Sequence, residues 1–541
     1  MTPRGAILQI AKMVGRDIRH GAPGPAALAA GSLLAQSGAT PELVACLVAE
    51  AGKKRPAGRI VEACCFLLES ALTELRIAGI GGDAAAHAML GDASAAIEAA
   101  VAAKRLPSDV LMPIARAIAQ AGLDPGPALR RATLAAMQDG AAADPASPPR
   151  GTPASHLAGI AQALGDDPFA IHAELAASGA AFPPEHRAAM AAELAASDIP
   201  ALRDAALGFL LDAHPAPGAE VLEVLAEQAR RHPLPSRVVE RLVSLRPWLP
   251  PARQPRMDAA IRSLRANTAA PVPVDRGEVK RLLASLCDGA GAQSLSALVK
   301  TGRRYALASV LVRADSGVAD AWVRDDMTKR EADDIVAQIT HAAEAVDVSL
   351  EFAEMRMSDA LATNLAREML PPFGLLHVTE AVGRGPLQPA ATSPMMLADT
   401  LLRGRPPGDV GPEATRAAHR DAADWRERFE TVGSWFEAGE AIDTLLNPIP
   451  SRRKRIAAVL AHHLPGRRAF WAERCAWMAA TLKGSGSSES GEWRGFALVA
   501  RDLAAGKAVA EVPLFAVIAE ATVDAFAAGP RTRRHVRLRG R

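Results

Sequence analysis

The sequence is poor in the residues that favour β-sheets. Only 4% of its 541 residues are aromatic, and Tyr305 is its single tyrosine. Hydrophobic residues still make up 49% of the chain, and alanine and leucine supply most of them. These two residues favour helices, whereas strands are enriched in β-branched and aromatic residues. The composition therefore predicts an all-α protein.

The sequence also lacks a disulfide framework. It has five cysteines, an odd number, and no C-x-x-C pair. This cysteine content is typical of the reducing cytoplasm. The adjacent Cys64 and Cys65 lie in the apolar stretch VEACCFLLES, and we interpret them as small buried residues and not as a redox pair.

Two further absences concern membranes and nucleic acid. No stretch of about 18 apolar residues is free of charge, and residues 1–21 lack the apolar core and A-x-A site of a secretory signal. We therefore expect a cytoplasmic protein without a membrane span. Because the formal net charge is only +2, binding to nucleic acid would need a local basic patch.

Short helical segments follow one another closely between residues 152 and 267. Most begin near Asp, Ser or Pro, which suits an N-cap or a first helical turn, and their starts recur about every 14 to 18 residues. In EVLEVLAEQARR, Val221, Leu222 and Leu225 form one apolar stripe at helical spacing. Such helices bury that stripe by stacking on their neighbours. The pattern resembles that of HEAT-type repeat proteins, which implies stacked helical hairpins in an α-solenoid or a chain of small helical domains.

Segments rich in proline, glycine and alanine divide the chain at 139–155, at 267–277 and before 414. The predicted parts are an N-terminal helical block (1–138), a helical-repeat block (152–267), a third helical block (275–384), a Trp-rich C-terminal helical unit (414–530) and a basic tail (531–541). In the third block, Thr328 and Glu331 have the spacing of a capping box. The nearby stretch YALASVLVRADSGVADAWV is compatible with a strand, but we predict helix.

The stretch RRAFWAERCAW, residues 467–477, gathers aromatic and basic residues on one predicted helix. Three interpretations are open. It can be a core helix whose Arg474 stacks on tryptophan and pairs with Glu437, Glu440 or Asp443. It can present a partner-binding face, because Trp and Arg are enriched in interface hot spots, or a stacking platform for single-stranded nucleic acid. The candidate partner-binding residues are Trp435, Arg467, Trp471, Arg474 and Trp477.

The C-terminal tail RTRRHVRLRGR is a second candidate site. It contains six arginines and no acid, so it could contact phosphates, although basic runs alone are weak signals. The candidate nucleic-acid contacts are Arg531, Arg533, Arg534, Arg537 and Arg539.

The sequence contains no convincing catalytic, metal or cofactor signature. His462 and His463 are adjacent, so on a helix they point about 100° apart. His341 and Glu344 have i,i+3 spacing, but a single such pair is usually a surface contact. By exclusion, the first functional hypothesis is an interaction scaffold that binds another protein and needs no cofactor. The alternative is nucleic-acid binding through the C-terminal unit and tail, and an enzyme with an unrecognised helical active site is the third hypothesis.

Overall fold

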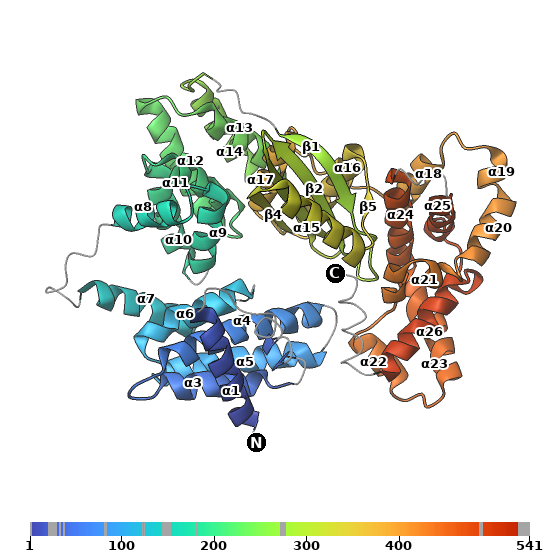
Figure 1. Cartoon of the computed structure of the whole chain (residues 1–541), viewed down its shortest axis with the longest axis horizontal. Helices are drawn as coiled ribbons and strands as arrows, with labels where there is room; N and C mark the ends of the chain where they lie inside the picture. Colours follow the sequence, from blue (N-terminus) through green and yellow to red (C-terminus); the bar gives the residue numbers. More distant parts are fainter. Residues whose placement is uncertain are drawn as a thin grey trace. The chain divides into compact units, whose positions relative to one another are not determined.

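The fold is known from a computed structural model of the chain (Figure 1). It describes residues 3–19, 30–31, 34–35, 38–80, 84–121, 123, 125–142, 153–179, 182–270, 277–485 and 491–528. The chain divides into two compact units, Met1–Ala205 and Ala206–Arg541.

The first unit is helical throughout its described residues. Its helices are α1 (Pro3–Arg19), α3 (Thr40–Ala51), α4 (Gly58–Ile80), α5 (Ala84–Ala102), α6 (Ser108–Gln120), α7 (Pro127–Ala142), α8 (Pro153–Ala163), α9 (Pro168–Gly179), α10 (Pro184–Ala196) and α11 (Pro200–Ala206). Many of them begin at a proline, whose fixed φ and missing N–H are tolerated in the first helical turn. The helices from α1 to α7 share one apolar core, which includes Leu43, Leu67 and Ile114.

The second unit begins with a further group of short helices. They are η1 (Leu207–Leu211), α12 (Pro215–Arg231), α13 (Ser236–Leu245), η2 (Arg246–Trp248) and α14 (Gln254–Arg265). The predicted stripe of α12 is correct, because Val221, Leu222 and Leu225 are buried while Glu220 and Glu223 lie outside it. Trp248 is fully buried, and its indole Nε1 donates to the carbonyl of Leu387 at 3.0 Å.

A five-stranded antiparallel sheet follows, so the all-α prediction is wrong. Its strands are β1 (Glu278–Ala284), β2 (Gln293–Thr301), β3 (Arg304–Arg313), β4 (Gly317–Met327) and β5 (Val346–Asp347), in the order β4-β3-β2-β1-β5. The stretch predicted as helix, YALASVLVRADSGVADAWV, forms β3 and most of β4. The reason is the ladder that β3 forms with both β2 and β4, which outweighs the helix propensity of its alanines and leucines. The chain is therefore neither a stack of helical hairpins nor a HEAT-like solenoid.

Helices cover both faces of the sheet. On one face α15 (Lys329–Ala342) packs against Leu283, Leu298 and Leu307. The predicted capping box of this helix is present, with Thr328 as its N-cap and Glu331 at N3. Gln293 projects to the opposite face, because it is five residues from Leu298 along β2 and side chains alternate. Its amide oxygen accepts a hydrogen bond from Arg356 of α16 (Leu350–Ala366) at 2.9 Å, which places α16 on that face; α17 (Gly374–Val382) also packs against β3 and β4.

The last part of the chain is helical and rich in tryptophan. Its elements are α18 (Pro394–Leu402), α19 (Pro407–Val410), α20 (Pro412–Asp421), α21 (Trp425–Arg428), η3 (Glu430–Ser434), α22 (Glu440–Leu446), α23 (Arg452–Ala458), the π-helical turn η4 (Val459–His463), η5 (Leu464–Arg467), α24 (Arg468–Gly484), α25 (Glu492–Ala504), η7 (Val509–Glu511) and α26 (Leu514–Ala527). All five tryptophans described in this part of the chain are buried, and Trp425 stacks on Phe496 with ring centroids 3.6 Å apart.

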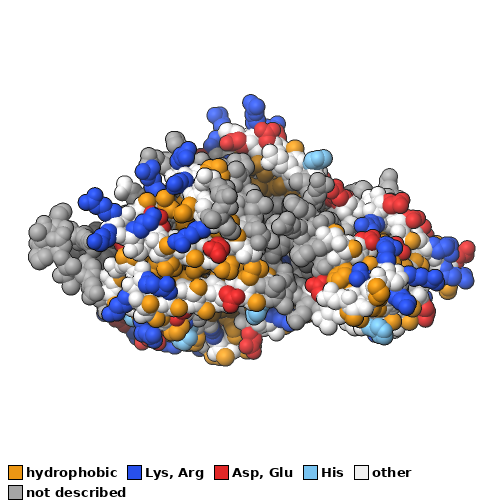
Figure 2. Space-filling model, turned by 90° about the horizontal axis from the view of Figure 1, so that it is seen from below, with side chains coloured by type: hydrophobic (Ala, Val, Ile, Leu, Met, Phe, Trp, Pro, Cys, Tyr) orange, Lys and Arg blue, Asp and Glu red, His pale blue; other side chains and the backbone are white. Residues whose placement is uncertain are grey.

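The surface carries charges of both signs. On the face drawn in Figure 2, Lys and Arg predominate at the left-hand end, among exposed hydrophobic side chains, and the two signs mix elsewhere. None of the helices that the structure describes is both long and apolar enough to cross a bilayer.

Candidate functional site

The partner-binding residues predicted from the sequence lie on α24 and the segments packed against it. Trp435, Trp471, Arg474 and Trp477 are at most 2% exposed, whereas Arg467 is about one-third exposed. The indoles of Trp435 and Trp471 contact each other with centroids 5.5 Å apart. Four of the five side chains therefore belong to the core in this conformation and offer a partner almost no surface.

Glu437 is the acid that this cluster surrounds. Its Oε1 accepts hydrogen bonds from Arg467 Nε at 2.8 Å and from Trp471 Nε1 at 2.9 Å. His463 Nε2, on the π-helical turn, lies 3.5 Å from Oε2. Burial alone would raise the pKa of the Glu437 carboxyl, but the adjacent His463 and Arg467 outweigh it and lower that pKa. Glu437 thus holds the start of α24 against the loop that precedes α22.

Arg474 does not pair with Glu437 or Asp443, two of the acids proposed from the sequence, and the side chain of the third, Glu440, lies outside the described residues. Its guanidinium stacks on the ring of Phe470 at 3.6 Å and donates to the carbonyl of Ala290 at 3.2 Å. Its nearest carboxylate is that of Glu473, at 3.4 Å. The buried Nε has no hydrogen-bond partner among the described residues. Stacking and backbone carbonyls therefore replace the expected ion pair.

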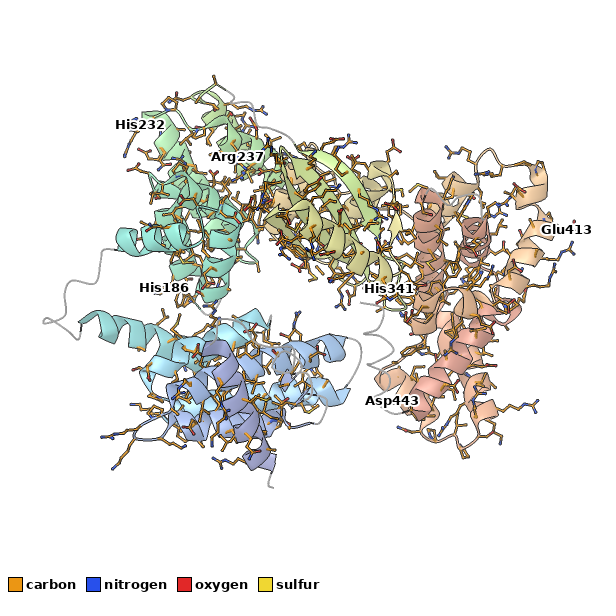
Figure 3. The ribbon with its side chains drawn as sticks, in the orientation of Figure 1. His186, His232, Arg237, His341, Glu413 and Asp443 are labelled. Atoms are coloured by element: carbon orange, nitrogen blue, oxygen red, sulfur yellow. The ribbon has the colours of Figure 1, made fainter. Side chains whose placement is uncertain are left out.

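The histidine candidates do not form a metal site. His341, at the end of α15 (Figure 3), is exposed. Glu344 is engaged elsewhere, because it accepts backbone N–H bonds from Glu430 at 2.9 Å and Thr431 at 2.5 Å and so caps η3. Across the described residues, no three His, Cys, Asp or Glu side chains gather where they could hold a metal ion. The candidate arginines of the tail, Arg531, Arg533, Arg534, Arg537 and Arg539, lie outside the described residues.

The first unit contains a groove that was not predicted from the sequence. It has a volume of about 640 Å³ and lies against α3 and α5. Its apolar lining residues are Pro41, Val44, Ala45, Val48, Ala49 and Ala96, and its charged lining residues are Arg4, Lys104 and Arg105. Among the residues that the structure describes, no acid lines it. We call it the basic groove.

More cations lie beside the basic groove. The loop between α3 and α4 carries Lys53, Lys54 and Arg55, all exposed. This loop adjoins the loop between α5 and α6, because a Cβ on Gly52 would lie 3.3 Å from the carbonyl oxygen of Arg105. The acid among them, Glu50, is only 4% exposed and is bonded to Lys53 and to the backbone of Ala57. The exposed charged residues of these two loops, Lys53, Lys54, Arg55, Lys104 and Arg105, are therefore all positive.

The sequence does contain a signal for the basic groove and the cations beside it. The chain has only ten lysines, and four of them, Lys12, Lys53, Lys54 and Lys104, lie in its first 104 residues. The large excess of arginine made this clustering of lysine difficult to recognise, since basic residues are spread along the whole chain.

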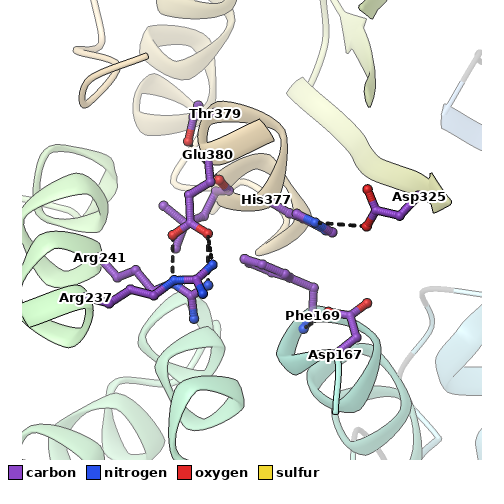
Figure 4. A network of polar contacts seen from close by, with 9 residues as sticks. Asp167, Phe169, Arg237, Arg241, Asp325, His377, Thr379 and Glu380 are labelled. Atoms are coloured by element: carbon purple, nitrogen blue, oxygen red, sulfur yellow. Dashed lines mark hydrogen bonds and ion pairs between the residues drawn. The ribbon is translucent and has the colours of Figure 1, made fainter. Parts of the chain in front are cut away.

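The second unit contains an arginine-rich pocket of about 550 Å³ between α13 and the end of α17. Glu380 of α17 accepts hydrogen bonds from Arg237 and Arg241 of α13 (Figure 4). Burial alone would raise the pKa of the Glu380 carboxyl, but these two guanidinium groups outweigh it and lower that pKa. These residues carry no local signal in the sequence, since the arginines and Glu380 are 139 to 143 positions apart.

Three domain models of one family match separate segments of the chain. The "Uncharacterised protein y4lR N-terminal domain" matches residues 28–126, the "Y4lR second domain" 183–268 and the "Y4lR C-terminal helical domain" 391–527. A relative described as "Uncharacterized protein y4lR", from Sinorhizobium fredii (strain NBRC 101917 / NGR234), is 28% identical over 450 residues, which cover 82% of this chain and 84% of the relative. No solved structure matches the chain. The chain is thus similar to a family of several domains, and its sheet lies between the second and third matches.

Proposed function

We propose that the protein binds another protein and that its N-terminal helical unit carries the docking surface. The occupant that fits the basic groove is an amphipathic helix with an acidic polar face. The observation that carries the proposal is the lining itself, in which an apolar floor is bordered by Arg4, Lys104 and Arg105 and, within the described part of the chain, by no acid. A helix that lays its apolar face in a groove is a common mode of peptide recognition.

The chemistry of the groove favours an acidic helix over nucleic acid. Single-stranded nucleic acid is bound by aromatic side chains on which bases stack, and none of the described residues that line this groove is aromatic. Ala45, Val48 and Ala96 supply apolar surface that a phosphate backbone would not use. The rim cations supply electrostatic complementarity, which sets the partner's orientation and accelerates association.

The test is a charge reversal in the groove, Lys104→Glu together with Arg105→Glu, in the full chain. The matched control is Arg453→Glu with Lys454→Glu, an adjacent and exposed basic pair on α23. The probe is a labelled helical peptide with a leucine face and a glutamate face, and its lysine-faced counterpart serves as the negative probe. We expect the groove variant to weaken binding of the acidic peptide by about tenfold, equal to ~1.4 kcal/mol, and the control to leave it unchanged.

The nucleic-acid alternative gives a different pattern with a labelled 20-nucleotide single strand as probe. Tight, salt-sensitive binding of this strand, lost on truncation after Pro530 and unchanged in the groove variant, would favour the C-terminal tail. Binding of the strand that is lost in the groove variant would assign the basic groove to phosphates. Equal binding of both peptides, or none, would overturn the proposed function.

A further inference from the structure

We infer that the arginine-rich pocket of the second unit is a binding site for a small organic phosphate. This site is separate from the basic groove and does not depend on the proposed function. The charged residues that line it are four arginines, Arg237, Arg241, Arg265 and Arg384, and two glutamates, Glu240 and Glu380. Cations are thus in excess.

The two arginines that bind Glu380 play different roles. Arg241 is 1% exposed, and it forms a bidentate pair with Glu380 through Nε at 2.7 Å and Nη2 at 2.9 Å. Arg237 is 49% exposed and makes a single contact, from Nη2 to Oε2 at 2.8 Å. Arg241 therefore neutralises Glu380 permanently, whereas Arg237 is free to turn its guanidinium to a ligand at little cost, because exposed ion pairs are weak.

Two further arginines complete the cationic rim. Arg265, at the end of α14, is exposed and has no ion pair or hydrogen bond within the described parts of the chain. Arg384, in the loop after α17, is held by Glu354 with Nε 3.0 Å from Oε1. Because a guanidinium presents a planar set of donors that matches phosphate oxygens, these groups and Arg237 suit a dianionic phosphate.

The rest of the lining indicates that the ligand carries an organic part. Val239, Val243 and Pro386 contribute apolar surface to the pocket. Its volume of about 550 Å³ lies within the range of about 300–1,000 Å³ of small-molecule sites, which is far more than one phosphate ion fills. The ligand would contact α13, α14 and α17 together, so its binding is expected to stabilise this junction.

Calorimetric titration of the full chain with phenyl phosphate and with inorganic phosphate tests this site. We expect saturable binding of phenyl phosphate, weaker binding of inorganic phosphate, and a rise in melting temperature with either anion. Arg265→Gln and Arg237→Gln should each weaken phenyl phosphate binding by tenfold or more, because each variant removes one of the cations that bind the phosphate. Both variants retain Arg241 and Glu380, which form the buried ion pair. Arg262→Gln is the matched control, since Arg262 is an exposed arginine of α14 that does not line the pocket.

Absence of saturable binding by the unaltered chain would overturn the inference. So would unchanged affinity in both Arg265→Gln and Arg237→Gln, because binding would then occur elsewhere. Equal loss in Arg262→Gln would show a nonspecific effect of positive charge and would count against the site in the same way.

Discussion

Arg241 and Glu380 form a bidentate ion pair that joins α13 to α17 across 139 residues of sequence. The guanidinium is 1% exposed and the carboxylate 26% exposed. A charge buried to this degree is tolerated only when it is paired and hydrogen-bonded. The pair therefore fixes how the helices that precede the sheet pack against the helices that follow it.

Removal of the Arg241 charge should destabilise the second unit. Arg241→Met is expected to lower the free energy of unfolding by about 2–3 kcal/mol, somewhat less than the ~3–5 kcal/mol of fully buried pairs, because Glu380 retains some contact with solvent. Arg237→Met should cost less than about 1 kcal/mol, as exposed pairs do. Urea unfolding of the full chain measures both. A similar loss in the two variants would contradict the different roles assigned to these arginines.

The Arg241–Glu380 pair also predicts a dependence of stability on pH. The pKa of Glu380 is lowered from its ordinary value of 4.5 in the folded protein. Its stabilising contribution is therefore present above about pH 4.5 and is lost as the pH falls through the lowered value.

This dependence can be isolated with Glu380→Gln, which cannot ionise. We expect the unaltered chain to melt at a higher temperature than this variant at pH 7, and the difference to shrink progressively below pH 4.5. A difference that stays constant down to pH 3 would show that the Glu380 charge does not contribute to stability.

The sequence predicted the helices well because their signals are local. The prolines that begin helices such as α9, α10 and α12 set the backbone of one turn, and the stripe on α12 depends on residues within that helix. The sheet depends on contacts between strands. In β2 and β3, residues on both faces are buried, so the alternation of polar and apolar residues that indicates a strand is weak. The available signal was two glycines, Gly302 in the turn between β2 and β3 and Gly317 at the start of β4, which both adopt a positive φ.

The sites could be predicted only in part. The sequence singled out the aromatic and basic stretch around Trp471 and proposed Glu437 among the acids near it. It could not show that Arg467 and Trp471, and not Arg474, bind this acid. The basic groove and the arginine-rich pocket unite residues from separate helices. Spacing along the chain carries no information about such sites.

The cysteines give a prediction about reactivity. All five are buried and unpaired, and burial raises the pKa of Cys64 and Cys65 to about 12 and that of Cys287 to about 11. Because the thiolate is the reactive form, we expect no reaction with Ellman's reagent at pH 8 in the folded protein and five reactive thiols in denaturant. Because the pKa of these thiols is higher in the folded protein than the ordinary value of 9.0, their protonation contributes to stability below pH 9.0. This contribution to stability is lost as the pH rises towards 11–12. Rapid modification of the folded chain would show that its core opens.

The contact between Gly291 and Arg474 allows a test of the core around α24. Gly291 has a φ of +78°, and a Cβ at this position would lie 2.2 Å from Arg474 Nη2. Gly302 is the matched control, because its φ is +59° and nothing lies within 4 Å of a Cβ built there. Both substitutions to alanine incur the left-handed backbone penalty of about 1–2 kcal/mol, but only Gly291→Ala must also displace the guanidinium from the carbonyl of Ala290. We therefore expect Gly291→Ala to lower the melting temperature clearly more than Gly302→Ala does. Equal shifts would mean that Arg474 moves aside freely, and the stacked position of this arginine over Phe470 would then contribute little to the core.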